Sequence, residues 1–408
     1  MALLQPVAAV VLYPGLDVDG RIQQALKQLR PGEKISLSAG VFRFHQSLTL
    51  DIEGLVFQGA GRDQTILLFE QAGEGGGILV RSSAVRLSGF SVQKTQGPAL
   101  HLEGCTDIII SDVRLEWPDR QWRINSYLDE PVLHHMHDAL KISNSQDILI
   151  ESVRSLGALG SGISVTESAR VLIRNSEARE SAVGIYVMDS SQIELDSNQV
   201  ESNGIGIFID GSQATRGTKH VRIVKNQVSN NNNFNFAIED YWRYVEPLGT
   251  GLVIVGGKDI EVSANSISYH GTANLLISAH DSMLFPDRVY IHNNAFSHSG
   301  YAPDFARAGY LLIAGSGKLA SIVWDGNVPW QEMLGFEPRT GRVVLGINAG
   351  ADFVDLDLPW YDSMPALHRP KRDYRNYSGS LRPLPAVRFI SSNVAAFNRE
   401  TQDQSLQE

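Results

Sequence analysis

A short pattern recurs along the chain: a small residue, then an apolar, a variable and a second apolar residue. Its copies are Ala99–Leu102, Ala139–Ile142, Gly162–Val165, Gly184–Val187, Gly206–Ile209, Gly251–Ile254 and Asn274–Ile277. The short steps between copies are about 22 residues, and two steps are about twice as long. A chain with such a period folds by stacking similar turns, so the period constrains the fold more than any other feature of the sequence.

Each copy is followed by a second alternating strand. Examples are Gln192–Leu195, His220–Ile223, Asp259–Val262 and Arg288–Ile291. An asparagine follows each of these four strands at the same offset, at Asn198, Asn226, Asn265 and Asn294. Asparagines stacked at an inward-facing turn can hydrogen-bond to the turns above and below, so we predict a buried asparagine ladder.

A third short strand, such as Ser266–Ser268, completes each turn of the coil. Three strands per turn with alternating apolar residues predict an all-β fold, a single-stranded right-handed parallel β-helix. A β-propeller blade needs about 40 residues and a leucine-rich repeat needs its leucines, so neither alternative fits.

Both ends of such a coil need covering, because an open end exposes core and strand edges. Residues 19–29 are typical of an amphipathic helix, with Ile22, Ala25 and Leu29 on one face and a stop at Pro31-Gly32. We therefore expect an N-terminal segment with a capping helix (1–32), the β-helix (33–315), and a C-terminal β extension with a wrapping tail (316–408).

Charge and cysteine content narrow the class of protein. The formal net charge of −10 argues against nucleic acid as a partner, since nucleic-acid binding needs clustered lysine and arginine. Cys105 is the single cysteine, which excludes an internal disulfide. No apolar run reaches the roughly 18 residues needed to span a membrane. Residues 1–15 lack the basic start of a signal peptide, which indicates a processed, recombinant or cytoplasmic chain.

Alternation along the first strand of each turn places two columns of residues on the outer face. One column is small: Ala99, Ala139, Gly162, Gly184, Gly206 and Gly251. The other is His101, Lys141, Ser164, Tyr186, Phe208, Val253 and Leu276. We expect an exposed shallow trough that binds an extended ligand, with Ser164 and Phe208 among the contacts. The alternative is that the glycines only mark tight packing.

Two long insertions should rise beside this trough. The first, 117–137, carries Trp122 and Arg123, and the second, 230–248, carries the run Asp240-Tyr241-Trp242-Arg243. Long loops in compact folds are often functional, and aromatic rings beside arginines and acids suit the faces and hydroxyls of sugars. We therefore predict that these residues bind substrate, with packing of the aromatic rings onto the coil as the alternative.

The candidate chemistry centres on the run from His134 to Asp138. Abstracting a proton next to a carboxylate needs a base, a group that neutralises the enolate, and an acid for the leaving oxygen. Lys141 or a histidine could be base or neutraliser, and Tyr186 or His137 the acid, while Arg123 could hold the carboxylate. The predicted catalytic set is His101, His137, Asp138, Lys141 and Tyr186.

A metal is the alternative use of the same run. His134, His135 and His137, with a methionine among them, suit copper or zinc by ligand type. Adjacent strand residues point to opposite faces, so these histidines converge only if the loop curls. Calcium on Glu239 and Asp240 with loop carbonyls is the other cofactor that we consider, ahead of copper or zinc. Histidines that only cap strands are the third interpretation.

The chain resembles a family of exported right-handed parallel β-helix repeat proteins that carry a C-terminal Trp-Asp-Gly segment. The resemblance lies in Pro31–Gly40, Gly59–Ile66, Ser181–Val187, Gly249–Ile254, Gly271–Asn274 and Ile322–Gly326. It implies the fold and a periplasmic or extracellular location, and it carries no known activity.

More distantly, the chain is similar to pectate lyases, alginate lyases and alginate C5-epimerases, and by fold to the copper accessory protein of nitrous-oxide reductase. The Asp-Pro-His-Asp motif of alginate epimerases is reduced here to His137-Asp138. The paired aspartates and Gly-His-Gly of polygalacturonase-like hydrolases are missing.

The sequence therefore predicts a polysaccharide-active protein, a lyase or C5-epimerase, whose partner is an extended polysaccharide or oligosaccharide containing uronate. The alternative is a non-catalytic accessory protein that binds glycan or metal. We take the chain to be a monomer.

Overall fold

The computed structural model describes residues 9–69, 76–118, 137–211, 217–233, 248–271, 273–279, 287–299, 311–315, 322–325 and 345–346, and single positions 384, 386, 387, 389 and 394. The chain forms two compact units. Unit 1 comprises Met1–Ser164, Ser168–Glu177 and Arg388–Glu408, and unit 2 comprises Val165–Glu167 and Ala178–Val387. The sequence-based division at residues 32 and 315 stays a prediction.

Unit 1 begins with one strand, one helix and a parallel coil. Its first elements are β1 (Ala9–Leu12), α1 (Val18–Gln28), β2 (Lys34–Leu37), β3 (Gly40–Arg43), β4 (Leu48–Leu50), β5 (Val56–Gln58), β6 (Thr65–Leu68) and β7 (Ile78–Val80). The coil continues through β8 (Arg86–Gln93), β9 (Leu100–Glu103), β10 (Thr106–Glu116), β11 (Leu140–Ser143), β12 (Gln146–Glu151), β13 (Arg154–Leu156) and β15 (Ala169–Arg174). The chain passes between the units within β14 (Ser161–Thr166) and β16 (Glu177–Arg179).

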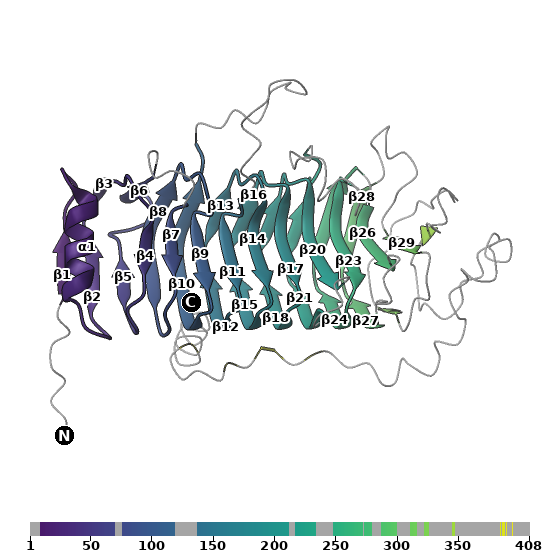
Figure 1. Cartoon of the computed structure of the whole chain (residues 1–408). Helices are drawn as coiled ribbons and strands as arrows, with labels where there is room; N and C mark the ends of the chain where they lie inside the picture. The colour runs from purple at the N-terminus through teal and green to yellow at the C-terminus, as the bar shows by residue number, and fades with distance from the viewer. Residues whose placement is uncertain are drawn as a thin grey trace, which may run out of the picture. The chain divides into compact units, whose positions relative to one another are not determined.

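Helix α1 differs from its predicted range by one residue at each end. Asp17 caps its N-terminus by accepting a hydrogen bond from the backbone N–H of Gly20. The helix buries Val18, Ile22, Ala25 and Leu26 and packs against β1 and β3, as Figure 1 shows. Leu29, which was expected on this face, is instead the C-cap. The helix therefore covers the first turn of the coil in unit 1, as expected for a cap.

Unit 2 repeats three strands per turn. The first strands are β17 (Val183–Met188), β20 (Ile205–Gly211), β23 (Thr250–Gly256), β26 (Ala273–Ala279) and β29 (Leu311–Gly315). The second strands are β18 (Ser191–Asp196), β21 (Lys219–Val224), β24 (Lys258–Ser263), β27 (Asp287–His292) and β30 (Ile322–Asp325). The third strands are β19 (Gln199–Glu201), β22 (Gln227–Ser229), β25 (Ser266–His270) and β28 (Ala295–Ser299), and β31 (Leu345–Gly346) pairs antiparallel with β29.

Each class of strand stacks on its own kind in parallel, which confirms the predicted β-helix. In unit 1 Leu79, His101 and Lys141 are in register on β7, β9 and β11. In unit 2 Tyr186 and Phe208 are in register on β17 and β20. The residues between these outward positions, such as Ile185 and Ile207, lie in the core with at most 1% exposure. The register follows from alternation, because a slip by one residue would turn the apolar face outward.

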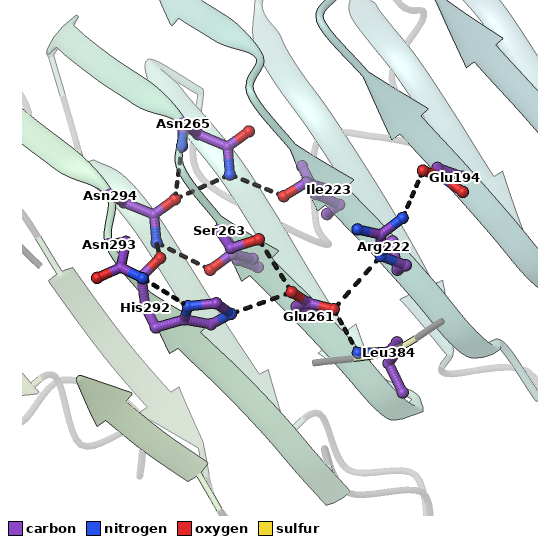
Figure 2. A network of polar contacts seen from close by, with 11 residues as sticks. Glu194, Arg222, Ile223, Glu261, Ser263, Asn265, His292, Asn293, Asn294 and Leu384 are labelled. Atoms are coloured by element: carbon purple, nitrogen blue, oxygen red, sulfur yellow. Dashed lines mark hydrogen bonds and ion pairs between the residues drawn. The ribbon is translucent and has the colours of Figure 1, made fainter. Parts of the chain in front are cut away.

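The predicted asparagine ladder is present in unit 2. The side-chain oxygen of Asn226 accepts from the backbone N–H of Asn198 at 2.9 Å. In the same way, Asn265 accepts from the N–H of Asn226 at 2.8 Å, and Asn294 accepts from the N–H of Asn265 at 2.9 Å. The amide NH₂ of Asn265 donates to Ile223 O at 2.8 Å (Figure 2). The ladder satisfies buried backbone groups at a turn that the strands themselves leave unpaired.

A second ladder, which the sequence analysis missed, runs through Asn203, Asn231 and His270. Asn231 Oδ1 accepts from the backbone N–H of Asn203 at 3.0 Å, and His270 Nδ1 accepts from that of Asn231 at 3.3 Å. His270 is fully buried, and its Nε2 lies 3.3 Å from Val228 O. The imidazole therefore replaces an asparagine in the ladder. Its Nδ1 accepts a hydrogen bond as the amide oxygen does, and its Nε2–H donates one as the amide nitrogen does.

Candidate functional site

The outward face of β9 and β11 in unit 1 gathers the residues that could carry chemistry. His101 and Lys141 stand beside each other in register. Both are half-buried, while the flanking Leu100, Leu102 and Leu140 point inward with 0% exposure. We call His101, Lys141, Asp138, Glu103 and Arg81 the His101 cluster, because the last four all act electrostatically on the imidazole.

Two further contacts define the surroundings of the imidazole. His101 Nε2 lies 2.9 Å from Ser143 Oγ, and that hydroxyl lies 3.4 Å from Leu102 O. With the Ser143 hydroxyl donating to the carbonyl, Nε2 carries the proton and donates to Ser143, and Nδ1 keeps its lone pair. Arg81 Nε donates to Glu103 Oε2 at 2.6 Å at the exposed edge of the cluster.

The charges in the cluster favour a neutral imidazole. Burial lowers the pKa of His101 below its usual 6.5, and the ammonium of Lys141 lowers it further. Glu103 and Asp138 oppose this effect more weakly. The hydrogen bond and charge of Arg81 lower the pKa of Glu103, which keeps that carboxylate ionised. At neutral pH the cluster thus presents an uncharged base beside a fixed cation.

Asp138 is held by the following turn of the coil. Its Oδ1 accepts from the backbone N–H of Ser161 at 2.7 Å, and its Oδ2 accepts from the Ser164 hydroxyl at 2.6 Å. The carboxylate is half-buried just before β11, and Ser164 is 1% exposed. The structure thus fixes Asp138 in place, and it makes Ser164 a support for Asp138 and not the exposed sugar contact that alternation had indicated.

His137 precedes Asp138 and is half-buried. Its backbone carbonyl accepts from the N–H of Gly160 at 3.1 Å. The other histidines of the run, His134 and His135, lie outside the described residues. So do Trp122 and Arg123 of the first insertion.

Tyr186 and Phe208 belong to unit 2, where they correct the expected trough. Tyr186 is 5% exposed and Phe208 0%, and their rings pack edge to face with centroids 5.4 Å apart. The Tyr186 hydroxyl donates to Asp210 Oδ2 at 2.8 Å. Val253 and Leu276 of the same column are also buried, at 0% and 1%. Alternation predicts the face of a strand on which a residue lies, but it does not predict whether other parts of the protein cover that face.

Some residues of the site escaped the sequence analysis. Arg81, Glu103 and Ser143 were not singled out, although Glu103 and Ser143 stand two residues after His101 and Lys141 and therefore on the same face. Asp210 was not singled out either, although the same spacing from Phe208 places it on the face of Tyr186.

The remaining predictions concern residues that the structure does not describe. Asp240, Tyr241, Trp242 and Arg243 of the second insertion lie outside the described residues, as does Glu239. Among the described residues, no group of three histidines, cysteines or acids could hold a metal ion. Calcium, copper and zinc remain predictions from sequence. No helix in the described ranges is long and apolar enough to cross a membrane.

Comparison with known proteins agrees with this architecture. Residues 125–296 match the model of the right handed beta helix region. The chain is similar to ORF18 of Geobacillus virus E2, with a TM-score of 0.53 and 11% identity over 82% of this chain and 66% of that one. It is also similar to the A-module of the mannuronan C-5 epimerase AlgE6 of Azotobacter vinelandii, with a TM-score of 0.50 and 11% identity over 77% and 94%. No curated protein matches the sequence.

At such identities the likeness shows the fold alone. The coil is a right-handed parallel β-helix, and the fold predicted from the repeat is confirmed.

A test of the cluster needs no substrate. Replacing Lys141 with methionine is expected to raise the pKa of His101, because the ammonium that opposes its protonation is removed. Titration of the imidazole Cε1–H signals by NMR measures this change, and a His101→Gln spectrum identifies the signal. Lys27→Met, at an exposed position on α1, is the matched control. An unchanged or lowered His101 pKa in Lys141→Met would contradict the electrostatic coupling.

Proposed function

We propose that the protein acts on an extended polysaccharide containing uronate, by removing the proton next to the sugar carboxylate, as a lyase or C5-epimerase. The observation that supports this most is the pair on β9 and β11: an imidazole with a lowered pKa in register with an ammonium. Such a reaction needs a base that is unprotonated at neutral pH and a group that neutralises the negative charge that develops, and a neutral imidazole and an ammonium can supply these two.

The charges of Lys141 and His101 determine the roles that we assign to them. Lys141 binds the uronate carboxylate and stabilises the negative charge that develops on it, while Nδ1 of His101 takes the C5 proton. In an elimination, the C4–O bond then breaks with its electrons on the oxygen, and an acid protonates that oxygen. Two residues were predicted as the acid, His137 and Tyr186. We propose His137 for this step, because it belongs to unit 1 with the His101 cluster. In an epimerase, a proton returns to C5 from the opposite face.

Asp138 is a positioning residue in this scheme. Its carboxylate is fixed by Ser161 and Ser164, and its charge acts on His101. Together with Glu103, which acts more strongly, it opposes the lowering of the His101 pKa by burial, Lys141 and Arg81, and this helps the imidazole to keep the basicity that it needs to accept a proton.

The fold supports a glycan as substrate. Stacked strands present their outward residues about every 4.8 Å, which suits a long unbranched ligand. The A-module of AlgE6, by its name part of a mannuronan C-5 epimerase, has a similar coil. Tyr186 and Phe208 are buried in unit 2, so the proposal does not depend on them.

Activity of matched variants tests the proposal. Wild-type protein is incubated with a panel of uronate polysaccharides, and product is followed by ultraviolet absorbance of unsaturated uronate and by NMR of the C5 epimer ratio. We expect His101→Gln and Lys141→Met to lose about 100-fold or more in kcat, since general bases and charge-stabilising groups contribute on that order. Lys27→Met should keep the wild-type rate. Variants of both cluster residues that turn over within twofold of wild type would refute the site.

A further inference from the structure

A row of charged side chains crosses the outward face of three neighbouring strands in unit 2. Glu194 on β18, Arg222 on β21 and Glu261 on β24 are in register. Arg222 bridges the two acids, with Nη1 2.5 Å from Glu194 Oε1 and Nε 3.4 Å from Glu261 Oε2 (Figure 2). The glutamate side chains are only 7% and 2% exposed. We call these three residues the docking row.

Each glutamate contacts the coil and also accepts a hydrogen bond from a backbone N–H of the C-terminal part of the chain. Glu261 Oε2 accepts from the backbone N–H of Leu384 at 2.6 Å, and Glu194 Oε2 accepts from that of Val387 at 2.6 Å. Glu261 Oε1 is held by Ser263 and His292, both at 3.0 Å. Leu384 is seen beside Glu261 in Figure 2. Carboxylates that accept from backbone amides form charge-assisted hydrogen bonds, which are among the stronger ones in proteins.

The spacing of these contacts matches one backbone conformation. Glu194 and Glu261 lie two strands apart in the stack, a separation of about 9.6 Å. A polyproline II chain rises about 3.1 Å per residue with three residues per turn, so amides at positions i and i+3 lie on one side, about 9.3 Å apart. The sequence around these amides is Pro383-Leu384-Pro385-Ala386-Val387, and alternate prolines favour that conformation. Proline has no N–H, and neither proline is at a donating position.

We propose that the docking row is a binding track for a proline-rich extended segment, which it recognises through backbone amides three residues apart. Its occupant is the chain's own Leu384–Val387. Because both contacts are to main-chain N–H groups, recognition depends on the spacing of the amides and the charge of the row and not on the side chains of the segment. This surface is separate in its residues from the His101 cluster and does not depend on the proposed activity.

Hydrogen exchange of the full chain, followed by mass spectrometry of fragments containing residues 384–387, tests the contacts. Glu194→Gln with Glu261→Gln removes the charge and keeps the shape, and we expect exchange at this segment to become about tenfold faster or more. Glu180→Gln, an exposed acid of unit 2, is the control and should leave exchange unchanged. Equal protection in the double variant and wild type would overturn the proposal.

Changes confined to the segment test the spacing without touching the coil. Leu384→Pro removes one of the two donors and should release the segment, whereas Ala386→Pro removes an intervening amide and favours the same conformation. A glycine inserted after Ala386 shifts the two amides out of step and should act like Leu384→Pro. Protection that survives the insertion would refute recognition by spacing, and protection that depends on protein concentration would show the segment of a second copy on the track and refute the chain's own occupancy.

Discussion

Unit 2 is expected to lose up to about 3 kcal/mol of stability through His270 alone when the pH falls from 7 to 4. Complete burial lowers the pKa of His270 from 6.5 to about 3, and the hydrogen bond to Val228 offsets only part of this. The unfolded chain takes up a proton near pH 6.5, and the folded chain does not until about pH 3. Between these values the unfolded state binds more protons, so stability is complete above 6.5 and falls as the pH falls.

The variant His270→Asn should remove this part of the acid sensitivity. An asparagine can accept from Asn231 N–H with its oxygen and donate to Val228 O with its nitrogen, as Asn231 does between Asn203 and Val200. Replacing the ring leaves a small cavity, so some stability is lost at pH 7, but that loss does not vary with pH.

Urea unfolding at pH 7 and pH 4, followed by circular dichroism, measures the difference. The stability of His270→Asn relative to wild type should improve by about 3 kcal/mol on going from pH 7 to pH 4. His220→Asn is the matched control, because its side chain is 51% exposed. The same pH dependence in wild type and His270→Asn would show that the buried imidazole is not what couples folding to protons.

Asn226→Asp should cost unit 2 about 3 kcal/mol or more at pH 7. The change is nearly isosteric, so packing is preserved. The side-chain nitrogen of Asn226 donates to Leu195 O at 2.8 Å, to Val224 O at 3.0 Å and to Asn265 Oδ1 at 3.0 Å. An aspartate has an oxygen in place of this nitrogen, so all three hydrogen bonds are lost. The buried negative charge of the aspartate then lies next to three acceptor oxygens, which repel it.

Asn230→Asp provides the comparison for this prediction. It is the same substitution four residues later, at an exposed position with a φ of 52°, which asparagine and aspartate both tolerate. Urea unfolding should separate the two variants by at least about 2 kcal/mol. If Asn226→Asp were no less stable than Asn230→Asp, the ladder would not stabilise the coil.

The stacked coil and the first ladder could be predicted because they repeat. Asn198, Asn226, Asn265 and Asn294 stand at one offset from alternating strands, and alternation put His101 beside Lys141 once the turns were aligned. The second ladder was hidden because its third member is a histidine, which serves as donor and acceptor in place of an asparagine.

What the repeat could not predict are contacts across long separations in sequence. Tyr186 and Phe208 were placed on the correct face but were expected to be exposed. In unit 1, Val394 packs on Ile109, Leu149 and Leu172, and its N–H donates to Asp107 at 3.1 Å. Ile109 and Glu261 both point outward. The sequence around each of them does not indicate that a segment more than a hundred residues away in the chain packs on it.

The proposed function is tested most directly by solvent deuterium exchange, because a lyase and an epimerase share the removal of the C5 proton. The protein is incubated in D₂O with each uronate polysaccharide, and both the remaining chain and the products are analysed by NMR. We predict deuterium at C5 in an epimerised chain, or loss of the C5 proton with formation of an unsaturated end, and neither in His101→Gln. No exchange and no elimination with any uronate polysaccharide that the protein binds would contradict the proposal and favour a non-catalytic glycan-binding protein.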